Sequence, residues 1–470
     1  MQDSWQNNVI YNIYPGSFGD LRFISSKLGY LEKLGIDVIC LHPVFCSPDA
    51  GNGYDISDHT KIDPRYGDLD DLDLLIKAAG ERSLKIIMDL PIDQTSDEHD
   101  WFKKSRDKEN PYRTCYFWQD KNIRPKKLSS FYGESAWHKD ELTGDYYLHL
   151  YSKRQPDLDY HDPKVLTLIK EIMELWLERG ISGFRLTGAD LIWKEPHNSG
   201  IKSIFSTDKV SSLINEMAED VTQPRNALLA AKTVFSPLSG SAFDIVCFAP
   251  YLKKRDAASI IREIIKEQSD NEPPGIFLED HDQPRFVSRF KDSSDFREIQ
   301  AKLTAIILLT LPGTPFIYQG QELGIPDVRK PDPFILSSKR HKGKVLSAKK
   351  ENARIPFPWD EQAGGIFRYI NAVSQEKDPV SVLSFHKKMI SLRKNTLELQ
   401  QGGYRVLEIR KTYAVYERYL AGNGSLRIII NLSNKGLNIP CEGSVLLSNY
   451  HRKSFGGDLF PYEGIIIRVL

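Results

Sequence analysis

Several polar residues stand where short apolar runs end, and they could do chemistry there. The segment 183–188 (GFRLTG) is typical of a short buried strand that ends in a polar cluster, with Arg185 and Thr187 in it. Asp89 and Lys232 fall at or near the ends of two other apolar runs. In a parallel barrel the carboxyl ends of the strands carry the chemistry, so these residues form the first candidate site. A threonine hydroxyl is a poor nucleophile unless a neighbouring base activates it.

The elements that would position these residues alternate between strands and helices. Eight runs of apolar, largely β-branched or aromatic residues predict strands at 9–14, 37–41, 84–90, 183–186, 226–232, 243–248, 275–279 and 314–318. Apolar residues recur at helical spacing in 23–34, 69–79, 163–180 and 299–311. Such alternation indicates βαβ units and a parallel sheet, and eight is the strand number of a TIM barrel. We therefore expect an α/β fold, a (β/α)8 TIM barrel.

Two stretches depart from this rhythm. The stretch after the third strand, 94–163, has little periodicity and predicts an inserted subdomain. From about residue 403 the pattern changes to short alternating β runs, which predict a C-terminal β-sandwich domain. The expected organisation is a barrel in 1–93 and 164–402, with the inserted subdomain at 94–163 and the β domain at 403–470.

Composition excludes several partners. The 470 residues include 63 Lys+Arg and 63 Asp+Glu, so net charge gives no reason to expect binding to nucleic acid or to an anionic membrane. The five cysteines are scattered and form no CxxC pair, which indicates reduced thiols. The N-terminus has no signal-peptide pattern, and the longest apolar run is too short to span a bilayer. We expect a cytoplasmic protein without a membrane span.

Further segments carry a family resemblance. They are 53–58 (GYDISD), 89–99 (DLPIDQTSDEH), 277–285 (FLEDHDQPR), 312–322 (PGTPFIYQGQE) and 352–360 (NARIPFPWD). In this order and spacing, together with 183–188, the chain resembles the α-amylase-type glycoside hydrolases, in their α-glucosidase and oligo-1,6-glucosidase branch, nearly from end to end. The resemblance implies the barrel, the inserted domain and the C-terminal β domain. It also implies a retaining mechanism in which two carboxyl groups about 5 Å apart flank the glycosidic bond.

The departures from the family pattern concern the catalytic positions. The resemblance puts the nucleophilic aspartate at Thr187 and the acid/base glutamate at Lys232, so both carboxyl groups are substituted. The third carboxylate, which supports the distorted sugar, is retained as Asp282. In the strand-three motif the Asn and His positions hold Asp93 and Gln94. Removing one member of a catalytic set commonly costs roughly four to six powers of ten in rate, so little hydrolysis by the family route is expected.

Other positions keep the residues that the family uses to bind sugar. Their expected substrate-binding set is Tyr54, Asp55, Asp89, Arg185, His281, Arg285 and Arg354. The family's N-terminal metal loop is absent, because Ser17-Phe18 is followed directly by Gly19-Asp20, and no metal or other cofactor is expected.

For several of these residues a structural interpretation stands beside the functional one. Tyr54 and Asp55 either grip a glucose or only stabilise their loop. Arg185 pairs with Asp282 or with Asp89, and Lys232 either pairs with Asp282 or extends to solvent. The tryptophans of the insertion form its small core or serve as sugar platforms; they are Trp101, Trp118 and Trp137. Asp190 and Asp280 lie nearby but match no catalytic position.

Three functions remain open. The first is an α-glucosidase-like protein that is impaired or inactive as a hydrolase, a pseudoenzyme that binds an α-linked glucose oligosaccharide or a protein partner. The second is an active glycosidase on short α-linked gluco-oligosaccharides with a rearranged site. The third is a soluble assembly partner related to amino-acid transporter heavy chains, which have a membrane helix before the barrel that this sequence lacks.

Overall fold

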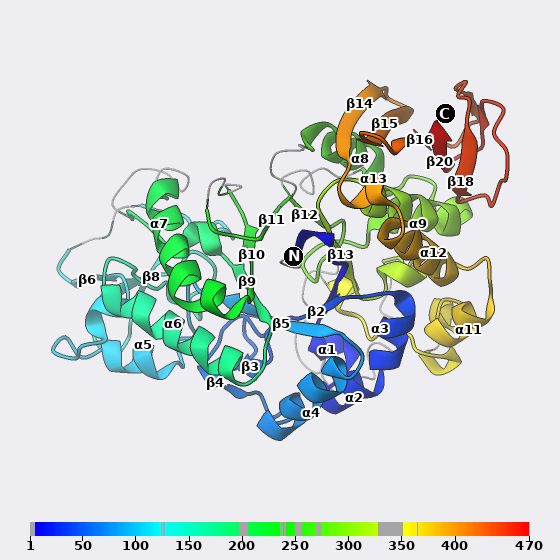
Figure 1. Cartoon of the computed structure of the whole chain (residues 1–470). Helices are drawn as coiled ribbons and strands as arrows, with labels where there is room; N and C mark the ends of the chain where they lie inside the picture. The colour runs from blue at the N-terminus through cyan, green and yellow to red at the C-terminus, as the bar shows by residue number, and fades with distance from the viewer. Residues whose placement is uncertain are drawn as a thin grey trace. The chain divides into compact units, whose positions relative to one another are not determined.

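The computed structural model describes residues 5–469 except 124, 126, 197–204, 236–237, 239–240, 250–255, 269–273, 328–350 and 364. The chain divides into two compact units. The first unit contains Met1–Phe18, Gly29–Val38 and Ala249–Leu470, and the second contains Gly19–Leu28 and Ile39–Phe248. Figure 1 follows the chain from its blue N-terminus to its red C-terminus.

Eight strands form the main sheet, and each predicted strand is present. They are β1 (Ile10–Ile13), β2 (Val38–Leu41), β5 (Lys85–Pro91), β9 (Gly183–Thr187), β10 (Leu228–Thr233), β11 (Ile245–Phe248), β12 (Gly275–Ile276) and β13 (Thr314–Tyr318). Their order is β11-β10-β9-β5-β2-β1-β13-β12. The pairs β1–β13 and β12–β13 in the first unit, and β5–β9, β9–β10 and β10–β11 in the second, are parallel. The predicted TIM barrel is confirmed, and its strands are buried nearly throughout, as strands covered on both faces are.

Helices alternate with these strands, and helices are present at the predicted segments 69–79, 163–180 and 299–311. The α-helices are α1 (Pro15–Phe18), α2 (Leu21–Ser26), α3 (Leu28–Leu34), α4 (Leu69–Gly80), α5 (Asp100–Ser105), α6 (Pro163–Glu178), α7 (Thr207–Met217), α8 (Ala257–Glu267), α9 (Ser293–Thr310), α11 (Ala372–Lys377), α12 (Val382–Lys394) and α13 (Leu397–Gln400). The sequence predicts one helix over 23–34, but α2 ends at Ser26, and the next residue, Lys27, has a ψ of 1°, outside the helical range. No helix in the described part of the chain has the length and apolar character to cross a membrane.

Helix α6 leads the chain into β9, which carries two of the candidate residues. The helix begins where the side chain of Asp162 accepts a hydrogen bond from the backbone N–H of Lys164, and it buries an apolar face that includes Ile169 and Trp176. β9 then starts at Gly183, with φ of 150°, and a Cβ there would lie 2.2 Å from the carbonyl oxygen of Leu228. Only glycine allows β9 and β10 to approach so closely.

Between β5 and α6, a small antiparallel sheet has its own core. Its strands are β6 (Trp118–Gln119), β7 (Trp137–Lys139) and β8 (Tyr146–Leu148), in the order β6-β8-β7. Trp137 is 8% exposed and packs in a cluster with Phe117, Leu148 and Leu150. This supports the core interpretation for Trp137. A second small sheet precedes this region and pairs β3 (Phe45–Cys46) with β4 (Asp58–Ile62).

The C-terminal part of the first unit is antiparallel, as predicted (orange and red in Figure 1). Strands β14 (Gly403–Ile409), β15 (Tyr413–Leu420), β16 (Gly424–Asn431), β20 (Gly464–Val469) and β18 (Ser444–Ser448) form one sheet in that order, and β17 (Leu437–Asn438) pairs with β19 (Asp458–Leu459).

Two buried arginines hold the carbonyl groups at the end of α9. Arg393 of α12 donates to the carbonyl oxygens of Leu309 and Leu311, at 3.0 and 3.1 Å. Arg418 of β15 donates to those of Thr310 and Gly402, at 2.9 and 2.8 Å. The carbonyl groups at the end of α9 lack helical partners, so both arginines cap this helix. Arg418, which lies on β15, also attaches the C-terminal sheet to it.

Candidate active site

Asp89 is the centre of the candidate site in the second unit. Asp89 on β5 is the register partner of Arg185 on β9, and its side chain is fully buried. Arg185 donates two hydrogen bonds to it, from Nη2 at 2.7 Å and from Nε at 3.2 Å. Thr187 donates from Oγ1 to Oδ1 at 2.5 Å, and the hydroxyl of Tyr54 donates to Oδ2 at 2.6 Å. Of the two partners expected for Arg185, the structure shows Asp89.

These contacts set the charge of Asp89. Burial by itself would raise the pKa of its carboxyl group, but the charge and hydrogen bonds of Arg185 outweigh burial and lower it to about 2. A carboxylate with so low a pKa is a weak base. Asp89 therefore accepts the hydrogen bond from Thr187 without activating the hydroxyl as a nucleophile.

His42, which immediately follows β2, extends this cluster. Its Nδ1 lies 3.2 Å from the hydroxyl oxygen of Tyr54, and its Nε2 lies 3.3 Å from Nη2 of Arg185. Because the guanidinium can only donate, Nε2 accepts, and because Tyr54 donates to Asp89, Nδ1 carries the proton. This fixes one neutral tautomer of His42. The sequence analysis does not single out this residue, although its place at a strand end is the signal used for the others.

Thr187 and Lys232 are direct neighbours across two strands. They are Cα partners in the parallel pairing of β9 with β10. The backbone N–H of Gly188 also donates to the carbonyl oxygen of Lys232, at 3.3 Å. Lys232 is half-buried. The two positions that the resemblance assigns to the nucleophile and to the acid/base therefore lie side by side on the sheet.

A second group of charges lies buried after β5. The side chains of Lys194 and Asp157 have no solvent exposure, and Nζ of Lys194 is 3.3 Å from Oδ1 of Asp157. Lys194 also donates to the backbone carbonyl of Asp93, at 3.0 Å. Burial raises the pKa of Asp93 to about 8, and that of Asp157 to about 6, even though Lys194 acts in the opposite direction. Lys194 is a residue that the sequence analysis missed, since it carries no strand-end signal.

Two other acidic residues have structural roles. The carboxylate of Asp190 accepts hydrogen bonds from the backbone N–H groups of Val234 and Phe235, at 2.9 and 2.5 Å. The carboxylate of Asp55 accepts from the hydroxyl of Ser47 and from the amides of Ala50 and Gly51, each at 2.8 Å. Asp55 therefore holds its own loop together, which agrees with the structural interpretation.

In the first unit, His281 lies between two carboxylates. Its Nδ1 is 2.8 Å from Oδ1 of Asp280, and its Nε2 is 2.9 Å from Oδ2 of Asp282. Arg354 donates to the other oxygen of Asp282, and Tyr14 stacks on the imidazole with ring centres 5.7 Å apart. Burial would lower the pKa of His281, but the two carboxylates outweigh it and raise the pKa. Asp282 thus has two basic partners, His281 and Arg354.

Arg285 lies in a buried ion pair. Its Nη1 is 3.0 Å from Oε2 of Glu279, and the two side chains are 1% and 2% exposed. Nη1 also donates to the carbonyl oxygen of Gln319 at 2.8 Å, and the guanidinium lies over the ring of Tyr318. Glu279 is a further residue that the sequence analysis did not select. These contacts direct Arg285 toward its own unit's interior.

The stretch expected to have lost a metal loop forms a helix start instead. Oδ1 of Asp20 accepts from the backbone N–H of Phe23 at 2.8 Å and caps α2. The carboxylate in this stretch is therefore used for capping.

Comparison with known proteins covers almost the whole chain. The family model described as "Alpha amylase, catalytic domain" matches residues 2–232 and 230–402. The oligo-1,6-glucosidase of Parageobacillus thermoglucosidasius is 33% identical over 509 aligned positions, covering 92% of this chain and 91% of that protein. The trehalose-6-phosphate hydrolase of Escherichia coli K12 is also 33% identical, with the same coverage. The crystal structure of Bacillus licheniformis trehalose-6-phosphate hydrolase has a TM-score of 0.88 at 31% identity, covering 98% of this chain and 99% of that one.

Proposed function

Because this chain belongs to the alpha-amylase catalytic-domain family, in its α-glucosidase branch, we propose that it binds short α-linked gluco-oligosaccharides without cleaving them by the family's route. The observation that carries the proposal is the contact between Thr187 and Asp89. Thr187, at the nucleophile position, donates a hydrogen bond to the carboxylate of Asp89. The pKa of that carboxylate, about 2, makes it too weak a base to activate an alcohol.

The acid/base position supports the same conclusion. The family route needs a protonated carboxyl group to deliver a proton to the leaving oxygen. Lys232, the register neighbour of Thr187, cannot act as a carboxylic acid with a pKa near working pH. The buried carboxylate of Asp190 does not substitute for it, because it is bound to backbone amides.

The polar groups retained at the strand ends are the proposed sugar contacts. They are Tyr54, Asp55, Asp89 and Arg185 in the second unit, and His281, Asp282, Arg285 and Arg354 in the first. The most accessible of these residues are Asp282 in the first unit, with a 45% exposed side chain, and the half-buried Tyr54 in the second. Both offer oxygen atoms that can bind a sugar hydroxyl group. In this proposal Asp55 contributes by stabilising its own loop. Arg285 contributes by forming its buried ion pair with Glu279.

A paired assay tests the proposal. Wild type and the double variant Thr187→Asp, Lys232→Glu are compared on isomaltose, maltose, trehalose 6-phosphate and a chromogenic α-glucoside, and binding is measured by titration calorimetry. We expect a silent wild type that binds sugar and a variant that regains hydrolysis. The same two changes at Thr167 and Lys170, on α6, serve as the matched control and should restore nothing.

Two outcomes contradict the proposal in different ways. Hydrolysis by the wild type at rates typical of glucosidases would favour the second candidate, an active glycosidase with a rearranged site, in keeping with the names of its relatives. A wild type that neither cleaves nor binds any of these sugars would remove the sugar ligand and leave a protein partner as the function to test.

A further inference from the structure

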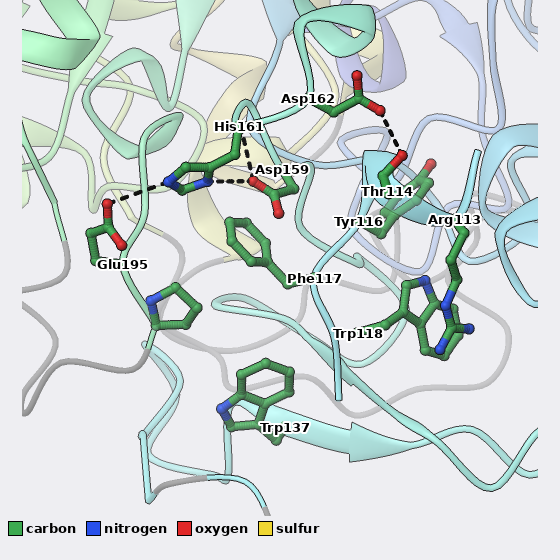
Figure 2. A pocket seen from close by; sticks show the side chains of 11 residues that line it. Arg113, Thr114, Tyr116, Phe117, Trp118, Trp137, Asp159, His161, Asp162 and Glu195 are labelled. Atoms are coloured by element: carbon green, nitrogen blue, oxygen red, sulfur yellow. Dashed lines mark hydrogen bonds and ion pairs between the residues drawn. The ribbon is translucent and has the colours of Figure 1, made fainter. Parts of the chain in front are cut away.

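A pocket of about 730 Å³ lies on the inserted region of the second unit, and it contains none of the strand-end residues. Figure 2 shows its side chains. It is lined by Arg113, Thr114, Tyr116, Phe117, Trp118, Trp137, Asp159, His161, Asp162, Glu195 and Pro196. Its size is that of pockets that hold small ligands, which are about 300–1,000 Å³.

One wall of the pocket is aromatic and rigid. Phe117 and Trp137 are each 8% exposed and belong to the buried cluster of the small sheet. Trp118 stacks on the ring of Phe102 at 5.4 Å, and the guanidinium of Arg113 lies 4.2 Å from the centre of its ring. Nε1 of Trp137 is a buried donor that finds no acceptor among the described residues. The wall thus needs no ordering when a ligand binds.

The opposite wall carries carboxylates. His161 lies between two of them, with Nδ1 2.6 Å from Oδ1 of Asp159 and Nε2 3.3 Å from Oε1 of Glu195. Asp162 accepts from the hydroxyl of Thr114 at 2.7 Å and from the first turn of α6. Figure 2 shows these groups on one side of the pocket, with Trp118 and Trp137 on the other.

The two basic side chains of the pocket already have carboxylate partners. Burial would lower the pKa of His161, but Asp159 and Glu195 outweigh it and raise the pKa. Arg113 is paired with Asp145 at 2.6 Å. Each carboxylate has about four lone-pair positions in all, more than its observed partners use. The wall therefore offers acceptors for neutral hydroxyl groups, whereas a phosphate would be repelled by three carboxylates.

We propose that this pocket is a second carbohydrate site, which binds a neutral glucose unit of an α-linked oligosaccharide away from the strand ends. The hydroxyl groups of the sugar donate to Asp159, Asp162 and Glu195, and its C–H faces lie against the aromatic wall, whose rings have negative faces. That the hydroxylated ligand is a sugar rests on the proposed function. The pocket itself shares no residue with the strand-end set that carries that function.

The test uses the full chain and two sets of variants. Isomaltotriose and maltotriose are titrated calorimetrically into wild type, into the pocket variant His161→Ala, Glu195→Ala, and into the strand-end variant Tyr54→Phe, Arg354→Ala. Lys170→Ala, Glu216→Ala removes another partly exposed ion pair of the same unit and is the control. Circular dichroism and thermal midpoints verify that each variant is folded.

We expect two binding components in the wild type, one of which weakens about tenfold or more in the pocket variant, as loss of a hydrogen bond to a charged group predicts. The control should leave both unchanged. If the strand-end variant removes all binding and the pocket variant removes none, the pocket proposal is wrong and the proposed function stands. If the pocket variant removes all binding and the strand-end variant removes none, the proposed function fails and the pocket stands.

A second ligand tests the chemical class. An aromatic wall with carboxylates also suits a quaternary ammonium ion, so tetramethylammonium is titrated in parallel. Because a sugar can donate hydroxyl hydrogen bonds to the carboxylates, whereas tetramethylammonium has no donor, we expect sugar binding and no detectable tetramethylammonium binding. Tetramethylammonium binding that the pocket variant abolishes, in the absence of sugar binding, overturns the assignment.

Discussion

Oγ1 of Thr187 donates a hydrogen bond of 2.5 Å to Oδ1 of Asp89, and the same carboxylate holds Arg185 and the hydroxyl of Tyr54. The family's mechanism needs a nucleophilic carboxylate at residue 187. Here the side chain at that position instead donates a hydrogen bond to Asp89. The substituted nucleophile position thus supplies a hydrogen bond to Asp89, and the contribution of that bond to the stability of the fold can be measured.

Replacing Thr187 by valine keeps the shape of the side chain and removes the donor to Asp89. We expect the free energy of unfolding to fall by about 1.5 to 3 kcal/mol, the usual range for a hydrogen bond to a charged group. Urea denaturation measures this, with Thr167→Val on the exposed face of α6 as the control. An unchanged midpoint for the residue 187 variant would show that the contact does not stabilise the fold.

Asp89 should make the free energy of unfolding depend on pH in the acidic range. Its folded pKa of about 2 lies below the ordinary value of 3.8, so its stabilisation is complete above about pH 4 and is lost as the pH falls toward 2. A shift of this size corresponds to about 2 kcal/mol. In unfolding experiments from pH 6 to pH 2, Asp89→Asn should be less stable than wild type at pH 6, and the difference should shrink below pH 4. A difference that stays constant over this range would contradict the low pKa.

Asp93 should have the opposite effect. Its folded pKa of about 8 means that the folded state keeps a proton that the unfolded state releases above about pH 4, so stability declines as the pH rises from 4 to 8. Asp93→Asn removes this titration and should be more stable than wild type by roughly 2 kcal/mol or more at pH 8, and close to it at pH 4. Denaturation at both pH values measures the gain, and the exposed Asp70→Asn is the control. Parallel pH profiles for wild type and Asp93→Asn would refute the assignment.

The buried pair of Glu279 and Arg285 offers a comparison with an exposed one. Glu279→Gln leaves a guanidinium of 1% exposure without its anion, and we expect a loss of about 3 to 5 kcal/mol. Glu298→Gln breaks a contact of similar length with Arg297, 3.1 Å, in which the glutamate is 62% exposed, and should cost less than about 1 kcal/mol. Thermal or urea unfolding of both variants gives the answer; equal losses would mean that burial does not control the energy of these pairs.

The elements of the barrel were predictable because each buried strand is a short apolar run. The strand 314–318 was predicted to the residue, and the helix predicted over 163–180 is α6, Pro163–Glu178. The break between α2 and α3 was not, since the apolar spacing continues through Lys27 and a backbone angle makes the difference. The helices α8 and α12 were not predicted either, although α8 has an apolar face of five buried residues.

The site was predictable where it depends on strand position. Thr187 and Lys232 occupy matching ends of neighbouring strands, and the family motifs locate such ends. The pairing of Arg185 with Asp89 depends on which strands lie together, which no local pattern contains. The same holds for Lys194 with Asp157, whose pairing spans 37 positions of sequence and is set by burial.

Arg393 and Arg418 make the folding of the first unit collective. Between them they hold carbonyl oxygens of Leu309, Thr310, Leu311 and Gly402, so the end of α9, the helix α12 and the strand β15 share one set of hydrogen bonds. If the C-terminal sheet detaches, Arg418 is separated from the carbonyl oxygen of Thr310, and this end of α9 loses a buried donor. The sheet and the helices of this unit should therefore melt in a single transition, and proteolysis between residues 402 and 403 should require opening of the whole unit.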